Sequence, residues 1–224
     1  NRFVGRVTRA LKKLMGGKSP SVTSAEYWDA KYETEEFIYT KVANRFVIEL
    51  CADLKPGKAI DLAGGEGRNT VWLAEQGWQV ENVDISRKGL AKCLEFAQER
   101  GVSDRVRVLN ASGDSFKSTL APVDLGIVPY LQVPADLLEA SLANLASQVR
   151  RGGIVVGVWH SLDNLSGGFG GPQDPQVLPS VASMRAICER VGLEIELCEN
   201  RDGQVQTKDG LRPSITLVLK AVVR

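Results

Sequence analysis

The stretch from Lys58 to Ser86 constrains the fold more than any other part of the chain. It begins with a short apolar run at 59–63, which is typical of a buried strand and which leads into a glycine-rich loop. Residues at helical spacing follow and stop at Gly77, and a second strand then ends on the acid Asp84. The order strand, glycine loop, helix, strand and acid predicts the first half of a nucleoside-binding α/β fold.

The residue types of this stretch suit a nucleoside ligand. Glycine has no Cβ, so the loop at 64–67 lets a ligand approach the backbone closely. The N-terminus of the following helix has free N–H groups and the positive end of the helix dipole, which favour an anionic group. A carboxylate at Asp84, at the end of the second strand, can accept hydrogen bonds from both ribose hydroxyls. An αβ unit with a tight turn and no ligand is the simpler alternative.

Two classes of ligand fit the loop. A dinucleotide fingerprint requires Gly-x-Gly-x-x-Gly, and here Thr70 stands where its last glycine belongs. The run from Asp61 to Asn69 reads Asp-Leu-Ala-Gly-Gly-Glu-Gly-Arg-Asn. It resembles the first motif of class I S-adenosylmethionine methyltransferases, in particular that of the tellurite-resistance and thiopurine methyltransferase group. Ala63 replaces the first glycine of that motif, and if the position requires φ > 0 this costs about 1 kcal/mol.

Two further segments resemble the same group. Trp28 and Tyr32 lie in a Trp-Asp-x-x-Tyr pattern that precedes the core in the family and folds over the cofactor, which implies a lid. Aromatic side chains that plug the edge of a sheet are the simpler interpretation. The family's third strand usually ends in Ala-Asp, whose carboxylate accepts a hydrogen bond from the adenine amino group. Here Ser112 replaces that acid and is a weaker acceptor, while Asp114 is an alternative two residues later.

The acceptor side of the site is expected beyond the fourth and fifth strands. Tyr130 and Gln132 lie in a Tyr-Leu-Gln-Val-Pro pattern that resembles the end of the family's fourth strand, beside the transferring methyl group. His160, the only histidine, follows the fifth strand and is a candidate general base, although a lone histidine at a strand end is more often structural. The loop at 163–175 resembles bacterial members of the group and is expected to be a mobile substrate lid, with a surface connection as the alternative.

The motifs and the resemblance together assign residues to three roles. Residues assigned to the cofactor are Trp28, Asp61, Ala63, Gly64, Gly65, Gly67, Asp84, Ile85, Ala111, Ser112 and Pro129. Tyr32, Tyr130 and Gln132 are assigned to substrate binding and His160 to catalysis, and no metal site is expected.

The remaining pattern predicts an α/β fold with a doubly wound, mostly parallel seven-stranded sheet of the Rossmann-like methyltransferase type and a helical N-terminal extension. Further strands are expected at 106–109, 123–128, 154–159, 193–198 and 214–223. Further helices are expected at 26–32, 41–53, 86–100, 137–149 and 181–191, and Leu94 in the third of these is expected to face the core. We expect one domain at 21–224, preceded by a basic amphipathic arm at 1–20.

The arm and the body of the chain differ in charge. Residues 1–18 contain six of the 28 Lys and Arg residues and no acid, which suits contact with a membrane or another anionic partner. A basic helix or frayed arm that packs loosely on its own domain is the alternative. The remaining 22 basic residues face 27 acidic ones, so a nucleic-acid surface is not expected on the main domain.

Composition fits a soluble globular protein, with 43% hydrophobic and 25% charged residues. No apolar run approaches the roughly 20 residues that a membrane span needs. The four cysteines have no Cys-x-x-Cys spacing and are expected to be reduced and mostly buried in a cytoplasmic protein.

These observations predict an S-adenosylmethionine-dependent methyltransferase that acts on a small-molecule acceptor, with a thiol or chalcogen nucleophile as one option. Because the sulfonium is already activated, the protein mainly aligns the nucleophile, and such orientation can supply about 7–11 kcal/mol of the barrier. One alternative is a catalytically weak or inactive S-adenosylmethionine-binding protein, because Ala63 and Ser112 both depart from the motifs. Another is an NAD-dependent Rossmann oxidoreductase, which Thr70 disfavours. The sequence leaves the oligomeric state open.

Overall fold

The computed structural model describes residues 21–224, and the basic arm predicted at 1–20 lies outside them. The strands are β1 (Lys58–Leu62), β2 (Gln79–Asp84), β3 (Val106–Asn110), β4 (Val123–Pro129), β5 (Val149–His160), β6 (Leu193–Thr207) and β7 (Gly210–Val223). The helices are α2 (Ala25–Lys31), α3 (Arg45–Cys51), α4 (Arg68–Glu75), α5 (Arg87–Glu99), α6 (Ala135–Gln148), α7 (Asn164–Gly167) and α8 (Val181–Val191). Two 3₁₀ turns occupy Ser103–Arg105 and Pro175–Val177.

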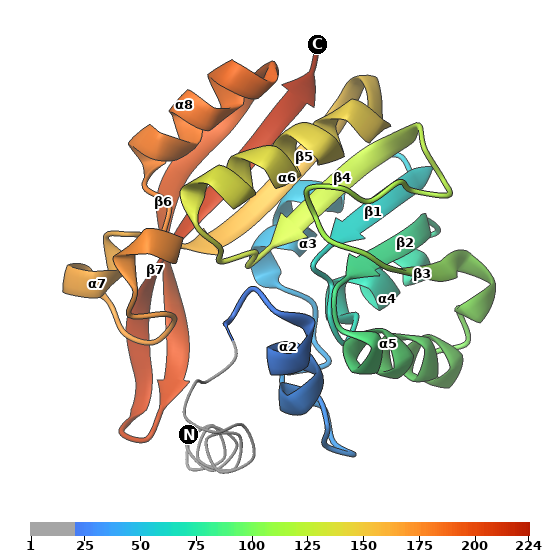
Figure 1. Cartoon of the computed structure of the whole chain (residues 1–224), viewed down its shortest axis with the longest axis horizontal. Coiled ribbons are helices and arrows are strands. Elements are labelled where there is room, and N and C mark those ends of the chain that lie inside the picture. Colours follow the sequence, from blue (N-terminus) through green and yellow to red (C-terminus); the bar gives the residue numbers. More distant parts are fainter. Residues whose placement is uncertain (1–20) are drawn as a thin grey trace.

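The seven strands form one sheet in the order β3-β2-β1-β4-β5-β7-β6 (Figure 1). The pairs among β1 to β5 are parallel, whereas β7 runs antiparallel to both β5 and β6. Strand order reverses between β1 and β4, which is where ligands bind in open α/β sheets. The predicted fold class, a doubly wound and mostly parallel sheet, is confirmed.

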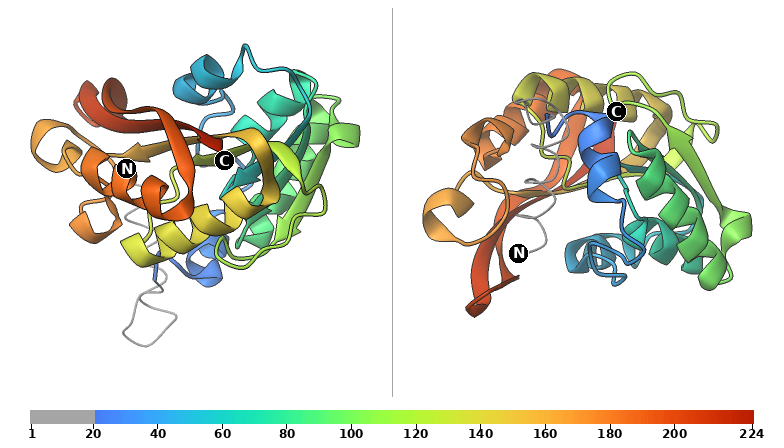
Figure 2. Two further views of the ribbon diagram at one scale, coloured as in Figure 1. Left: turned by 90° about the horizontal axis from the view of Figure 1, so that it is seen from above. Right: turned by 60° about the horizontal axis from the view of Figure 1, so that its bottom comes forward.

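Helices cover both faces of the sheet (Figure 2). One hydrophobic cluster joins the sheet to α6 and α8, and a second joins it to α3, α4 and α5. In β5, Val155 and Trp159 belong to the first cluster, while Val156 and Val158 belong to the second. This alternation follows from the two-residue period of a strand and shows why β5 has apolar residues on both faces.

Two details of the fold differ from the sequence prediction. Strands β6 and β7 form a longer hairpin than expected, which extends past the other strands (Figure 1). The residues at 199–207 are mostly polar, so no apolar run marked this part of β6, and backbone pairing with β7 continues the strand. Leu94 was expected to face the core but is 43% exposed, because Cys93 and Phe96 occupy the inner face of α5.

The N-terminal helix α2 lies beside the carboxyl ends of the strands and packs on α5 (Figure 1). Asp29 of α2 accepts hydrogen bonds from the Ser86 hydroxyl at 2.6 Å and from the Lys88 N–H at 3.2 Å. These contacts fix α2 next to the start of α5. Within residues 21–224, no helix is long and apolar enough to cross a membrane.

Candidate functional site

The glycine loop at 64–67 packs tightly against the elements around it. A Cβ on Gly64 would lie 2.5 Å from Asn82 Oδ1, and one on Gly67 would collide with Cys93 Sγ. Gly67 also has φ +85° and is the N-cap of α4. The loop therefore requires glycine for its own packing, in addition to any approach by a ligand.

Ala63, at the start of this loop, adopts φ +59°. Its N–H donates to the carbonyl of Val83 at 2.7 Å, which fixes the backbone there. The position therefore requires the left-handed conformation that the family's glycine adopts freely and that an L-residue adopts at a cost of about 1–2 kcal/mol. Alanine at this position is strained.

Asp84 joins the end of β2 to the glycine loop. Its Oδ2 accepts the N–H of Gly65 at 2.9 Å, and its Oδ1 accepts the N–H of Ser86 at 2.8 Å. Burial raises the pKa of Asp84 to about 6, while the hydrogen bonds from Ser86 and Gly65 oppose that shift. The side chain lies where the sequence predicted a ribose ligand. A carboxylate has about four acceptor positions, so both oxygens retain capacity for a hydroxyl donor.

Asp61 is fully buried beneath the same loop. Its Oδ2 accepts the Thr70 hydroxyl at 2.6 Å, whereas its Oδ1 has no hydrogen-bond partner among the described residues. Burial raises the pKa of Asp61 to about 7. Asp61 therefore supports the loop from within, in a position where the neutral acid is nearly as stable as the carboxylate.

Tyr32 covers the loop from the N-terminal side. It is 7% exposed, and its hydroxyl would lie 2.5 Å from a Cβ on Gly65. Its ring stacks on Trp28 with centroids 5.9 Å apart and packs against Gly89 of α5. The Asp84 charge adds to the effect of burial in raising the pKa of Tyr32. The structure thus brings Trp28 and Tyr32 together over the cofactor side of the predicted site.

The residues predicted to contact adenine lie after β3. Ala111 donates its N–H to the carbonyl of Asp84 at 3.1 Å, which keeps this strand end beside β2. Asn110 donates to the carbonyls of Asp84 and Ile85 at 3.0 and 2.9 Å. The Ser112 hydroxyl donates to Asp114 Oδ1 at 2.6 Å, so the two candidate acceptors form one pair.

Pro129 is the last residue of β4. Tyr130 follows it and forms one wall of the site with His160, at the end of β5. Their ring centroids are 5.0 Å apart, and the Tyr130 hydroxyl accepts from Asn44 Nδ2 at 3.1 Å. Tyr130 has φ +62°, a conformation that is rare for a bulky residue and that is often found at functional sites. The structure therefore brings together two of the residues predicted for the acceptor side.

The imidazole of His160 is half-buried, with the loop at 163–175 packed on one side of it. A Cβ on Gly171 would lie 2.7 Å from the ring, so the loop at 163–175 packs directly on it. Nδ1 is buried and has no hydrogen-bond partner among residues 21–224. Burial lowers the pKa of His160, so the imidazole is neutral at pH 7 and its free nitrogen can accept a proton.

Gln132 ties two segments together with its side-chain amide. Oε1 accepts the N–H of His160 at 2.6 Å, and Nε2 donates to the carbonyl of Val177 at 2.7 Å. Both polar ends of the side chain are thus used within the protein. The predicted contact between Gln132 and the acceptor stays a prediction. In the structure, the Gln132 side chain links the end of β5 to the 3₁₀ turn at Pro175–Val177.

The loop at 163–175 includes the short helix α7 and is anchored by Asn164. This buried side chain donates to the carbonyls of Phe169 at 3.2 Å and Gly170 at 3.0 Å, and accepts the N–H of Ile215 at 2.7 Å. Asn164 therefore fixes the loop to β7 next to His160. The predicted mobility of the loop stays a prediction.

Sequence reasoning missed three charged residues at the site. Glu66, between two loop glycines, is 4% exposed and pairs with Lys92 of α5 at 3.0 Å. The signal for this pair was a lysine on the buried face of an amphipathic helix, next to Cys93. Arg68 is half-buried, and its guanidinium carbon lies 5.9 Å from the centroid of the Tyr130 ring.

Comparison of the sequence with known proteins finds methyltransferases. Residues 59–153 match the model of a methyltransferase domain family. Over 106 residues the chain is 31% identical to ribosomal RNA small subunit methyltransferase C of Alcanivorax borkumensis, a match that covers 45% of this chain and 31% of that protein. The chain spans less than half the length of the curated relatives it matches.

Solved structures share the whole fold. A structure from work on the conversion of a disulfide bond into a thioacetal group during echinomycin biosynthesis matches with a TM-score of 0.71 at 17% identity, covering 89% of this chain and 91% of that chain. TehB from Haemophilus influenzae matches with a TM-score of 0.67 at 15% identity, covering 89% of this chain and 67% of that chain. Other structures of this fold hold S-adenosylmethionine or S-adenosylhomocysteine.

The domain match, the strand order and the site define the class. Residues 59–153 match a methyltransferase domain, and the described chain has the fold of solved methyltransferases that hold S-adenosylmethionine or S-adenosylhomocysteine. The predicted class and cofactor are therefore confirmed, and the likeness to TehB agrees with the predicted resemblance to the tellurite-resistance group. The roles of the individual site residues stay predictions.

Replacing Ala63 by glycine should stabilise the domain by up to about 1 kcal/mol. Relief of the left-handed strain outweighs the greater chain entropy that glycine loses on folding. Urea unfolding of the Ala63→Gly variant measures this change. The control is Ala91→Gly at an exposed position of helix α5, which should cost about 1 kcal/mol. A loss of stability at both positions would contradict the argument.

The Asp61→Asn variant should change how stability depends on pH. Burial raises the folded-state pKa of Asp61 to about 7. The contribution of the protonated side chain to the free energy of unfolding is therefore greatest below pH 4 and is lost as the pH rises toward 7. The stability of the variant relative to the original chain should therefore improve from pH 4.5 to pH 7, as measured by urea unfolding. Exposed Asp104→Asn is the control and should show no such trend. A difference independent of pH would contradict the raised pKa.

Proposed function

We propose that the chain transfers the methyl group of S-adenosylmethionine to a small-molecule acceptor, with an anionic thiol or chalcogen nucleophile preferred. The observation that supports this most is the position of Asp84, which bonds the glycine loop at the end of β2 and is a ribose acceptor in this fold. Thr70, where a dinucleotide fold needs glycine, is fully buried and donates its hydroxyl to Asp61. That arrangement disfavours the oxidoreductase alternative.

The residues present fit the cofactor. Asp84 would hold the ribose hydroxyls, Ile85 and the Ser112–Asp114 pair would border the adenine, and the loop at 63–67 would contact the methionine moiety. When bound, S-adenosylmethionine supplies a methyl group on a positively charged sulfur, which is a good leaving group. The protein then has to orient the acceptor and exclude water, since alignment supplies most of the rate.

The acceptor would lie against the wall formed by Tyr130 and His160. The neutral imidazole can accept a proton from an oxygen or nitrogen acceptor, and the loop at 163–175 closes the wall through Gly171. A thiol that is ionised in solution needs no such base. His160 would then contribute to the shape of the pocket more than to proton transfer.

Arg68 favours an acceptor that is anionic when it attacks. Its guanidinium lies near the Tyr130 ring, and its charge opposes the effect of burial on the pKa of that tyrosine. None of the ion pairs in the described part of the chain involves Arg68. An unpaired guanidinium stabilises a nearby thiolate or carboxylate. This supports a soft anionic nucleophile over a neutral one.

A small molecule is a better candidate for the acceptor than RNA, although a curated relative is a ribosomal RNA methyltransferase. Residues 21–224 contain 22 basic and 27 acidic side chains, whereas a phosphate backbone requires a basic surface. The matched region covers only 31% of that relative, so its RNA substrate does not transfer with the likeness.

The Asp84→Asn variant tests the cofactor site. We expect it to bind S-adenosylhomocysteine at least about 10-fold more weakly than the original chain, because a hydrogen bond to a charged group contributes about 1.5–3 kcal/mol. Titration calorimetry measures both affinities, and Asp104→Asn, at the opposite end of the sheet, is the control. Unchanged affinity in Asp84→Asn, or tighter binding of NAD than of S-adenosylhomocysteine by the original chain, would refute the proposal.

The His160→Asn variant distinguishes the two kinds of acceptor. Turnover of an oxygen or nitrogen acceptor should fall by about 10²–10⁴-fold if His160 is the base. Turnover of a thiol that is ionised at the assay pH should change little, and affinity for S-adenosylhomocysteine should remain the same. Rates from a panel of model thiols, phenols and amines give the comparison. Equal, negligible losses for every acceptor would return His160 to a structural role.

A further inference from the structure

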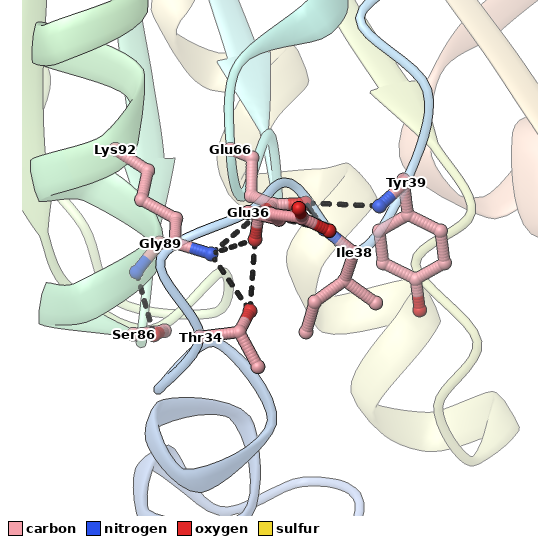
Figure 3. Close-up of polar contacts among 8 residues, drawn as sticks. All are labelled: Thr34, Glu36, Ile38, Tyr39, Glu66, Ser86, Gly89 and Lys92. Carbon is pink, nitrogen blue, oxygen red and sulfur yellow. Dashed lines mark hydrogen bonds and ion pairs between the residues drawn. The ribbon is translucent and has the colours of Figure 1, made fainter. Parts of the chain in front are cut away.

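Residues 25–39, named here the N-terminal segment, are held over the glycine loop by two buried charges (Figure 3). The carboxylate of Glu66 accepts the N–H of Ile38 at 3.0 and 3.1 Å and the N–H of Tyr39 at 3.2 Å. These bonds attach the end of the segment to the centre of the loop. Glu66 lies directly between Gly65 and Gly67, so the segment and the loop share one anchor.

Lys92 completes this anchor from α5. Its ammonium group donates to Glu66 Oε2 at 3.0 Å, to the carbonyl of Glu36 at 2.7 Å and to the Thr34 hydroxyl at 3.2 Å. All three donor positions of the ammonium are therefore used (Figure 3). The turn between Thr34 and Tyr39 is bound on both sides by the pair.

The pair differs from other ion pairs of this region in its burial. The side chains of Lys92 and Glu66 are 10% and 4% exposed, whereas those of Lys88 and Glu33 are 44% and 68% exposed. The second pair also joins the segment to α5, at 2.5 Å. Solvent and salt weaken the exposed pair, while a buried pair is screened much less. Loss of one buried partner leaves the other charge without compensation.

The segment covers the carboxylate proposed to bind ribose. Tyr32 packs on Gly65 and Gly89, and Asp84 beneath it is only 8% exposed. A nucleoside reaches Asp84 only when Tyr32 moves away. The contacts of Glu66 and Lys92 hold the segment that carries Tyr32, so they oppose a movement of this segment away from the glycine loop.

We propose that the Glu66–Lys92 pair is a latch for the N-terminal segment, and that its release sets the rate at which S-adenosylmethionine enters and the product leaves. Glu66 and Lys92 are positioning residues, since they hold the N-terminal segment against the glycine loop and do not themselves contact the ligand. This inference rests on the proposed function only for the identity of the ligand. The attachment of the N-terminal segment to the glycine loop does not depend on which ligand binds.

The test compares Lys92→Met and the double variant Glu66→Gln/Lys92→Met with the original full chain. Hydrogen exchange of the peptide that contains Ile38 and Tyr39 is followed without ligand, and dissociation of S-adenosylhomocysteine is followed by stopped-flow fluorescence. We expect both rates to rise at least 10-fold in both variants, with a smaller change in equilibrium affinity because entry is faster too. The double variant removes both charges, so it tests the latch even if Lys92→Met does not fold.

Lys88→Met is the matched control, because it breaks an exposed ion pair between the same two elements. It should leave both rates within about 2-fold of the original chain. Unchanged rates in the double variant, or an equal rise in Lys88→Met, would overturn the latch. If the original chain does not bind S-adenosylhomocysteine, the proposed function fails, and exchange at Ile38 and Tyr39 still decides whether the pair holds the segment.

Discussion

The carboxylate of Asp84 holds together the elements that meet at the site. Its oxygens accept the N–H groups of Gly65, in the loop after β1, and of Ser86, the N-cap of α5. The carbonyl of the same residue accepts from Ala111 after β3. Three strand ends and one helix start are thus fixed relative to one residue. Burial raises its pKa to about 6, so the side chain remains mainly ionised at neutral pH and able to accept a ribose hydroxyl.

Three acids are buried around the glycine loop, and each is stabilised in a different way. Backbone N–H groups compensate Asp84, and the Lys92 ammonium compensates Glu66. Asp61 has one hydroxyl donor, and its pKa rises to about 7. The neutral form of Asp61 is therefore accessible near pH 7. This distribution keeps the charge of Asp84 for a ligand while Glu66 is committed to the N-terminal segment.

Most of the fold could be predicted because local patterns specify it. Apolar runs, Gly77 and the Ser86 cap set the order of strands and helices, and Asp84 lies at the predicted strand end. The sequence also raised the question of φ at Ala63, and the backbone there is left-handed. The hairpin of β6 and β7 was underestimated because its outer part is polar and depends on pairing between strands, which no local pattern records.

The candidate site could be predicted only in part, since its remaining contacts join distant parts of the chain. Glu66 and Lys92 are far apart in sequence and each looks like a solvated charge, so only the fold shows that they pair. The amide of Gln132 suits contact with an acceptor equally well, but the fold directs it to His160 and Val177. Polar side chains have many alternative partners, and long-range packing selects among them.

The structure of the chain with S-adenosylhomocysteine bound tests the central claim most directly. The account predicts that the ribose hydroxyls contact Asp84 and that the sulfur faces the wall formed by Tyr130 and His160. It also predicts that Tyr32 has moved from its place over Gly65. A nucleoside bound away from Asp84, or a sulfur that faces away from His160, would contradict the account.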